Sequence, residues 1–416
     1  MLGRIAAAAA VLASMSGPAN AEEAAASIAR LTVAEFLTRV EAADPRFEML
    51  EGDVAAQEAA VTVAGLWGNP SLAYDREEIA AGGRSFPENT IRLQLPLELS
   101  GRRGLRVEGA KLGAGAARQT ALRAKQGILL DALDVYLRAA AARVKLTTLL
   151  EEHDSLDRLV VAVKARAAAG EASGYDLDRL ALEADTLDDL VADCERELLA
   201  WRRALGLLSG APESRFDAND ELNLPAVPGP VSKAALLAAR PDYEAAGLRV
   251  AQAEMEIAAA GRGWVPGVSL SGGAKSAVFG ADPRWGYVAG AALSLPFLDH
   301  DQADRERARA RLRIARAERR LIEHQVMAQA STSSESLARV VSQAQQFEAN
   351  QVSRLDRLVK RAETSYQEGE RPIFELLDAY RTARATRLRV IELRLQARQA
   401  ELEVWRARGV GPGGHP

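Results

Sequence analysis

Few residues of this chain have the types and spacing that bond chemistry or metal binding requires. The four histidines are scattered, and no two of them stand four residues apart: His153, His300, His324 and His415. A protein metal site needs such side chains at close, regular spacing. No Ser/His/Asp arrangement and no glycine-rich phosphate loop stands out either. We therefore predict a protein that is not an enzyme and that holds no metal ion or other cofactor.

Two further features need a structural explanation. His300 stands between Asp299 and Asp301, just before a predicted helix. Acidic residues at a helix start complement the helix dipole, so we prefer this explanation to a metal site. Cys194 is the only cysteine, which excludes an internal disulfide. It lies in a row of apolar residues, and we expect it to be a small core residue.

The charged residues of most interest gather at two predicted turns between helices. The first turn reads RAAAGEASGYDLDRL, around Gly170 and Gly174, and the second reads YQEGERPIFELLDAY, around Gly369. Glycine permits a tight reversal, and Pro372 suits the first turn of the helix that follows. On the residues alone, these charges are also explained as side chains that solvate helix starts.

The two turns belong to the two halves of a tandem repeat. The segment from Asp44, DPRFEMLEGDVAAQEAAVTVAGLWGNPSLAY, aligns without a gap with RPDYEAAGLRVAQAEMEIAAAGRGWVPGVSL, from Arg240. Such self-similarity identifies a repeated structural unit. The predicted division is a signal peptide (1–21), a first repeat (22–211), a linker rich in Pro, Asn and Gly (212–230), a second repeat (231–408) and a flexible tail (409–416).

Each half is predicted to contain the same elements in the same order. These are a helix (about 33–64 and 233–260), two strands (about 70–77 with 89–97, and 266–274 with 286–296), a long helix (about 102–168 and 301–367) and a final helix (about 175–207 and 373–408). A helix of ~65 residues is a rod of roughly 100 Å, too long to pack inside one globule. The final helices carry apolar residues at alternating spacings of three and four, which is typical of a coiled coil.

The strands are predicted to face an apolar environment on one side. Leu72 and Tyr74 alternate with small or polar residues, and the segment 91–97 alternates in the same way. This is the pattern of outer-membrane barrel strands, whose apolar face meets lipid and whose polar face lines the interior. Tryptophans near the strand ends suit a membrane interface. A small soluble sheet packed on helices is the alternative. Four strands cannot close a barrel, so several chains would have to contribute to one.

Composition and the first residues narrow the class of protein. The 53 basic and 57 acidic residues give a net charge of −4, which does not suggest nucleic-acid binding. The start of the chain has a basic residue, an apolar run and an Ala19-Asn20-Ala21 cleavage site, as secretory signal peptides have. The remaining sequence contains no apolar segment of transmembrane-helix length. We expect an exported protein rich in long helices.

The chain resembles the TolC family of outer-membrane efflux proteins over nearly its whole mature length. The specific elements are the duplication and the segments NPSL, QLPLELSGRRGLRVEGA, SLPFLDHDQADRERARA and GERPIFELLDAYRTAR. ELSGRR, PFLDHDQ and ELLDAYR are most similar to the heavy-metal branch, of the cobalt-zinc-cadmium or copper-silver type. That branch usually carries a glycine shortly after PFLDHDQ, where Ala303 and Asp304 stand here.

The resemblance implies a mainly α fold with a small β part. Three chains would form a homotrimer, in which four strands from each chain make one twelve-stranded barrel in outer-membrane lipid. The helical hairpins would continue as an α-barrel through the periplasm. A periplasmic adaptor protein and an inner-membrane pump of the resistance-nodulation-division (RND) type are the implied partners. The implied function is passive conduction of substrate, with divalent heavy-metal cations favoured.

The resemblance also implies a gate at the periplasmic end of the helices. Asp176 stands where the family has an acidic gate residue, and Tyr366 and Arg371 match its tyrosine and arginine partners. Glu375 and Asp378 match two acidic rings that line the constriction. Acidic rings on a narrow axis attract cations and repel anions. The turn residues Gly170, Gly174, Gly369 and Pro372 are the expected adaptor contacts.

Two alternatives remain open at this point. The channel could serve multidrug efflux or type I secretion in place of metal export. The other alternative belongs to a different class, a periplasmic coiled-coil adaptor or scaffold without a pore. Such adaptors usually have one helical hairpin between all-β modules, whereas this chain has two matched hairpins and short strand pairs.

Overall fold

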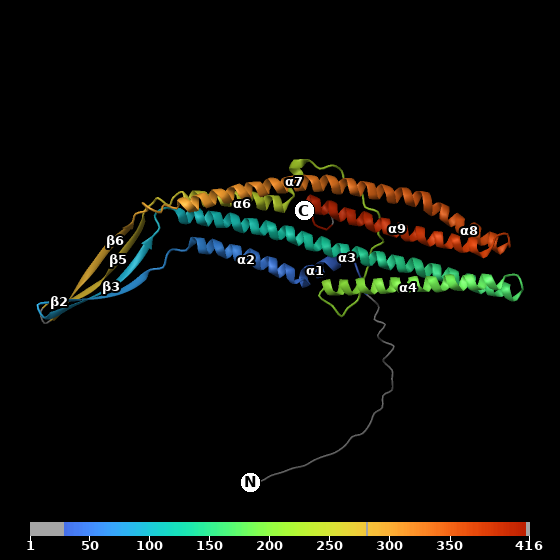
Figure 1. Cartoon of the computed structure of the whole chain (residues 1–416), viewed down its shortest axis with the longest axis horizontal. Coiled ribbons are helices and arrows are strands. Elements are labelled where there is room, and N and C mark those ends of the chain that lie inside the picture. The colour runs from blue at the N-terminus through green and yellow to red at the C-terminus, as the bar shows by residue number, and fades with distance from the viewer. Residues whose placement is uncertain (1–28, 280–281, 413–416) are drawn as a thin grey trace, which may run out of the picture.

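The structure is a long, narrow layer of helices with a small sheet at one end (Figure 1). This computed structural model describes residues 29–279 and 282–412. The predicted signal peptide and the last four residues of the predicted tail therefore lie outside the described residues. Most described residues are helical and few are in strands, as predicted. None of the described helices is long and apolar enough to cross a membrane.

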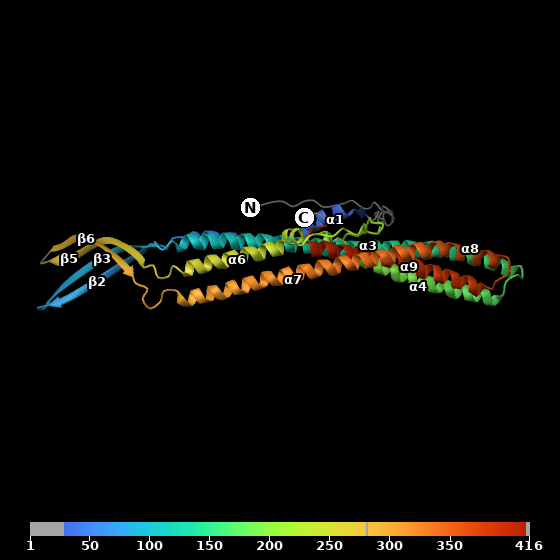
Figure 2. The same cartoon turned by 90° about the horizontal axis from the view of Figure 1, so that it is seen from above.

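The helices form four columns that run along the molecule. The columns are α2 (Pro45–Gly65) with α4 (Gly174–Leu208), then α3 (Arg102–Ala168), then α6 (Pro241–Ala260) with α9 (Ile373–Arg408), and last α7 (Gln302–Phe347) with α8 (Ser353–Gln367). Neighbouring columns pack against each other. Figure 2 shows that the layer is curved, since α7 lies well away from α3 near the sheet. The α2/α4 and α7/α8 columns are its two outer edges.

Proline divides the first predicted helix of each half, which corrects the prediction of one continuous helix there. The first half has α1 (Val33–Ala43) before α2, and the second has α5 (Lys233–Ala238) before α6. The residue before a proline is driven out of the helical conformation, and proline itself suits the first helical position. Asp44 caps α2 by accepting a 2.9 Å hydrogen bond from the Arg46 N–H.

The second long helix is not continuous, so the prediction of one helix over 301–367 is wrong at its centre. A π-helical turn, η1 (Glu348–Val352), separates α7 from α8. The Glu348 carboxylate accepts hydrogen bonds of 2.8 and 3.2 Å from Arg394 of α9, which fix the turn against its neighbour. Single π turns inside long helices are rare and are frequently found at functional sites. The first long helix, α3, has no such interruption.

The strands are longer than predicted and pair as two hairpins in one sheet. They are β2 (Ser71–Ala81), β3 (Arg84–Leu97), β5 (Gly267–Phe279) and β6 (Asp282–Ser294), all antiparallel and in the order β2-β3-β5-β6. Residues 78–88, predicted as a loop, are mostly strand. Gly82 and Gly83 both have positive φ, which suits a two-residue hairpin turn, so the strands can run to it from both sides.

Over the strand segments predicted from the sequence, register separates the sheet into one apolar and one polar face, as the alternation predicts. Directly paired residues share a face, and the apolar face carries Leu72, Tyr74, Ile91, Leu93, Leu95, Leu270, Ala274, Trp285 and Tyr287. Tyr287 is 89% exposed and Leu72 73% exposed, so this face is uncovered in the single chain. The polar face carries ion pairs between Arg92 and Asp75 at 2.6 Å and between Lys275 and Glu88 at 2.5 Å.

The sheet joins the helices at two equivalent junctions. Gly101 precedes α3 with φ of 70°, and Asp301 precedes α7 with φ of 64°. The Asp301 carboxylate pairs with Arg102 at 2.5 Å. This ion pair connects the starts of the two long helices, and so it ties the two halves of the chain together where strand becomes helix.

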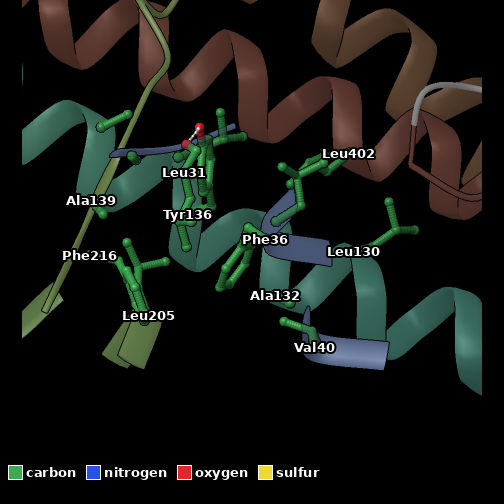
Figure 3. Close-up of a cluster of buried hydrophobic side chains, with 14 of the residues drawn as sticks. Leu31, Phe36, Val40, Leu130, Ala132, Tyr136, Ala139, Leu205, Phe216 and Leu402 are labelled. Atoms are coloured by element: carbon green, nitrogen blue, oxygen red, sulfur yellow. Dashed lines mark hydrogen bonds between the residues drawn. The ribbon is translucent and has the colours of Figure 1, made fainter. Parts of the chain in front are cut away.

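The largest core lies midway along the helices and contains two short strands that the sequence analysis did not predict (Figure 3). Strands β1 (Ala29–Leu31) and β4 (Phe216–Ala218) pair in parallel. The buried Tyr136 hydroxyl donates a 2.7 Å hydrogen bond to the Leu31 carbonyl and accepts one of 2.8 Å from the Asn219 N–H. This tyrosine therefore fastens both strands to α3.

The predicted coiled-coil row of α4 is buried. Its members Leu180, Leu187, Cys194, Leu198 and Leu205 are all in the core. Cys194 has the predicted core position, and burial raises the pKa of its thiol. A raised thiol pKa keeps the group in the unreactive protonated form.

Candidate functional site

The candidate site lies at the helix ends farthest from the sheet, where both helical hairpins turn. The two turns have the same geometry. Gly170 has φ of 78° and Gly369 has φ of 76°. Next to them, the Glu171 N–H bonds the Arg166 carbonyl at 2.8 Å, and the Glu370 N–H bonds the Ser365 carbonyl at 2.9 Å. This is the Schellman pattern, in which glycine takes the left-handed position that other residues adopt only with strain.

Asp176 is fixed by the start of α4. Its carboxylate accepts a 3.2 Å hydrogen bond from the Ser173 N–H, and its own N–H donates to the Ser173 hydroxyl at 3.2 Å. This reciprocal pair is a capping box, which satisfies two backbone donors at the helix start. Gly174 is the first residue of α4. In the single chain, Asp176 therefore has the contacts of a helix-start residue, which is the explanation that the residues alone suggest.

The start of α9 arranges three of the predicted gate residues in one row. Helix α9 begins at Ile373 as predicted, but Pro372 has extended geometry and occupies the position just before the helix, not one in its first turn. Arg371 pairs with Glu375 at 3.0 Å, and the exposed Asp378 follows on the same helical face. Within one chain Asp176 and Arg371 do not pair with each other, because Asp176 bonds Ser173 and Arg371 pairs with Glu375.

A different residue connects the two hairpins at this end. Arg166, in the last turn of α3, donates a 3.0 Å hydrogen bond to the Tyr366 carbonyl, and its guanidinium lies 5.3 Å from the centroid of the Tyr366 ring. Tyr366 is buried, and its hydroxyl has no hydrogen-bond partner among the described residues. Burial raises the pKa of this phenol, the nearby Asp176 charge raises it further, and Arg166 opposes them.

At the tip, Asp176 lies near enough for its charge to affect Tyr366, and Arg166 contacts Tyr366 directly, while the gate role of these residues stays a prediction. Sequence reasoning missed Arg166. A signal was present, because a basic residue in the last turn of a helix is favourable for the helix dipole and often interacts with its last carbonyls. Its acceptor, however, is a carbonyl 200 residues further along the chain, and no local pattern gives that contact.

A second connection between the hairpins lies further from the turns and is buried. The Glu183 carboxylate of α4 accepts hydrogen bonds of 2.7 Å from Arg381 and 2.6 Å from Arg384, both on α9. Arg384 also faces Glu152 of α3 at 3.6 Å. Glu152, Glu183 and Arg384 are each less than 10% exposed. Buried charges of this kind need their partners, so the cluster fixes the hairpins against each other.

The two carboxylates of this cluster respond to burial in opposite directions. Burial raises the pKa of Glu183, but the hydrogen bonds from Arg381 and Arg384 outweigh it, and the net effect is a lowered pKa. Burial also raises the pKa of Glu152, and the more distant Arg384 does not compensate, so that pKa remains raised. The Oε2 atom of Glu152 has no hydrogen-bond partner among the described residues.

The three described histidines are separated in space as well as in sequence, since His153 lies on α3, His300 just before α7 and His324 within α7. His153 of α3 contacts Asp188 of α4 at 2.8 Å and Asp157 at 3.4 Å, one through each ring nitrogen. Asp301, beside His300, forms an ion pair with Arg102. Over residues 29–279 and 282–412, no three His, Cys, Asp or Glu side chains are placed to hold a metal ion.

The sequence is similar to a known family and to two proteins of metal resistance. Residues 234–410 match the profile of the outer membrane efflux protein family. Nickel-cobalt-cadmium resistance protein NccC of Alcaligenes xylosoxydans xylosoxydans is 25% identical over 280 residues, which are 66% of this chain and 62% of that protein. Nickel and cobalt resistance protein CnrC of Cupriavidus metallidurans is 26% identical over 291 residues, 67% of this chain and 69% of that protein. The chain thus spans less than two thirds of NccC.

Solved structures resemble the whole described fold. The CusC structure has a TM-score of 0.77 at 18% identity and covers 92% of this chain and 93% of its own. The outer membrane protein VceC of Vibrio cholerae has a TM-score of 0.73 at 17% identity, covering 91% and 96%. The MtrE outer membrane channel of Neisseria gonorrhoeae has a TM-score of 0.72 at 14% identity, covering 92% and 90%. At these identities the likeness concerns the fold alone.

Proposed function

We propose that this chain, which belongs to the outer membrane efflux protein family, is the outer-membrane duct of a tripartite efflux system. The observation that carries the proposal is the sheet with one apolar and one polar face, joined directly to long helices. Such a sheet suits lipid on one side and water on the other. The duct does no bond chemistry and conducts its substrate passively.

The sheet supports the trimer in this proposal. Strands β2 and β6 are its edges, and each has unpaired backbone groups along one side. In lipid these groups must find partners, and only a closed barrel provides them. Three copies with four strands each would give the twelve-stranded barrel of the proposed homotrimer. The columns of helices would then form a tunnel through the periplasm, and export would require the predicted signal peptide.

The tip residues support a gate at the entrance of the duct. Arg371, Glu375 and Asp378 follow one face of α9, and Asp176 lies close to Tyr366. In this proposal the acids form rings around the axis, and the contacts of Tyr366 keep the hairpins together when the duct is closed. The turns at Gly170, Gly174, Gly369 and Pro372 would meet a periplasmic adaptor, which links the duct to an inner-membrane RND-type pump.

The proposed cargo is a divalent heavy-metal cation. NccC and CnrC are resistance proteins for nickel and cobalt by name, and NccC also for cadmium. The acidic residues of α9 would favour cations at the entrance. The fold is similar to channels of several names, with TM-scores from 0.72 to 0.77, so it does not choose between metal, drug and protein export.

A deletion strain tests the proposal. We expect loss of the gene to increase sensitivity to one or more of zinc, cobalt, cadmium, copper and nickel, and the intact gene to restore growth. Cell fractionation should place the protein in the outer membrane as a heat-modifiable oligomer that requires detergent. If the deletion strain keeps its metal sensitivity unchanged but becomes sensitive to organic drugs, the cargo is a drug and not a metal cation. A soluble periplasmic monomer would refute the duct.

A further inference from the structure

The two outer edges of the helical layer are the α2/α4 and α7/α8 columns in Figure 1, and their sequences carry opposite charge. Helix α4 contains nine acidic and four basic residues, a net charge of −5. Helix α8 contains four basic and two acidic residues, a net charge of +2, although it is less than half as long. Because α4 and α8 end at the same tip of the molecule, their charges lie at comparable heights.

On α8 the relevant charges form a row on the side away from the rest of the chain. Arg354, Leu358 and Arg361 follow at spacings of four and three, and all three are exposed. The other side of α8 contacts α9, since Glu363 accepts a 2.5 Å hydrogen bond from the Tyr380 hydroxyl. Neither arginine has an ion-pair partner among the described residues.

Helix α4 carries a matching row of opposite charge. Asp178, Leu182 and Asp185 follow at spacings of four and three, and all are exposed. They lie opposite the buried row that contains Leu180 and Leu187. Neither aspartate forms an ion pair with any described residue. Both rows therefore have the same composition, a leucine between two like charges, with the sign reversed.

The two rows also agree in position along the molecule. Asp178 lies eight residues after the turn glycine Gly170, and Arg361 lies eight residues before the turn glycine Gly369. Asp185 and Arg354 each lie fifteen residues from the same glycines. At 1.5 Å per residue these charges stand at about 12 Å and about 22 Å from the turns.

The upper part of each edge repeats the pattern. Asp53 and Glu48 of α2 lie 12 and 17 residues before the end of that helix, and Arg313 and Arg320 of α7 lie 11 and 18 residues after its start. All four side chains are exposed, and no ion pair within the described chain engages them. Acidic α2 continues the acidic edge of α4, and basic α7 continues the basic edge of α8.

We propose that a second copy of this chain docks its acidic α2/α4 edge on the basic α7/α8 edge, with Asp178 facing Arg361 and Asp185 facing Arg354. The two edges differ from each other, so the contact is heterologous and can be repeated until a ring closes. This inference rests on the proposed assembly of the duct from several copies. It adds which surfaces meet, in which register, and that charge directs them.

Disulfide cross-linking between copies tests the register. The chain Asp178→Cys with Arg361→Cys, in a Cys194→Ala background, is oxidised in outer membranes and run on a non-reducing gel. We expect covalent dimers and larger species, because the two cysteines lie on opposite edges of one chain. The matched control moves the first cysteine to α3 with Asp154→Cys, an exposed aspartate of an inner column, and should give no ladder.

Charge reversal tests the role of electrostatics in the same cross-linking chain. Asp185→Arg places like charges opposite each other, and we expect the cross-linked fraction to fall about fivefold at low salt, since exposed pairs are weak individually. Adding Arg354→Asp reverses the partner and should restore the ladder. At 1 M salt the Debye length is about 3 Å, so the original ladder should weaken as well.

The outcomes separate this inference from the proposed function. Absence of a ladder, an equal ladder in the Asp154→Cys control, or no response to Asp185→Arg would each overturn the docking register or its electrostatic origin. Metal sensitivity of the deletion strain does not enter these measurements. A ladder in a protein that confers no resistance would leave the docking intact and refute the cargo alone.

Discussion

Arg166 of α3 and Tyr366 of α8 are held together by a 3.0 Å hydrogen bond to the tyrosine carbonyl and by a guanidinium 5.3 Å from the ring centroid. The two residues belong to different hairpins and lie within four residues of their turn glycines. The contact lies close to both turns, and it connects the two hairpins through Tyr366, a predicted gate residue. Its release would remove a contact between the hairpins at the tip without disturbing the core around Tyr136.

We predict that Arg166→Ala shifts the duct toward its open state. A hydrogen bond from a charged donor contributes about 1.5 kcal/mol, which corresponds to about a tenfold change in an equilibrium. Mean single-channel conductance in a planar bilayer should therefore rise. Lys164→Ala, which removes an exposed charge two residues away, is the matched control and should leave conductance unchanged.

Single-channel conductance also distinguishes the contribution of Arg166 to the closed state from that of Arg371. Arg371 pairs with Glu375, four residues further along the same hairpin, so within one chain it does not hold the hairpins together. If Arg371→Ser raises conductance as much as Arg166→Ala, Arg371 must have a partner on another chain in the closed duct. If neither variant changes conductance, the proposed gate at this end is wrong.

A second prediction concerns the acidic row of α9. Glu375→Ala with Asp378→Ala should weaken block of the channel by trivalent cations, because rings of carboxylates bind such ions on a narrow axis. The concentration for half block should rise at least about tenfold, given that each lost charge–ion contact contributes on the order of 1 kcal/mol. Glu151→Ala with Asp154→Ala removes two exposed acids from α3 and should have no effect. Equal block in both double variants would refute the rings.

The sequence predicts the parts of this structure that local patterns determine. The turn glycines, the buried row around Leu187 and the alternating strand faces follow from spacing alone. Pro45 and Pro241 also gave a local signal for a break in the helix, and the prediction of continuous helices overlooked it. The π turn at 348–352 gave no such signal, and the contact that holds it comes from Arg394 of another helix. The Arg166–Tyr366 contact was out of reach for the same reason.

A third prediction tests the strand-fastening role of Tyr136. Tyr136→Phe removes the hydroxyl that donates to the Leu31 carbonyl, and it leaves the Asn219 N–H without its hydrogen-bond acceptor. A lost buried hydrogen bond costs about 1 to 3 kcal/mol, so the thermal midpoint of the helical circular dichroism signal should fall. Tyr175→Phe, at a 63% exposed position, is the control and should leave the midpoint unchanged. Equal midpoints for both variants would show that the hydroxyl does not stabilise the core.

A fourth prediction concerns the buried pair of Glu183 and Arg384. Glu183→Gln leaves Arg384 without its closest carboxylate, and breaking a buried ion pair costs about 3 to 5 kcal/mol. The folded-state pKa of Glu183 is lowered, so the stability it contributes is present above the unfolded pKa and is lost as pH falls through the folded pKa. The variant should therefore be much less stable than the original protein at pH 7, and the difference should shrink in acid. A difference independent of pH would mean that packing, not charge, is lost.

The neighbouring Glu152 should behave in the opposite way. Its pKa is raised by burial, so its charged form opposes folding, and stability falls as pH rises from the unfolded pKa through the folded one. Glu152→Gln removes this cost and keeps the Glu183–Arg384 contact. We expect the variant to be more stable than the original protein at pH 8 and equal to it near pH 4. Thermal midpoints across this range check the sign. A variant that loses stability at pH 8 would show that the 3.6 Å contact with Arg384 outweighs the burial of the charge.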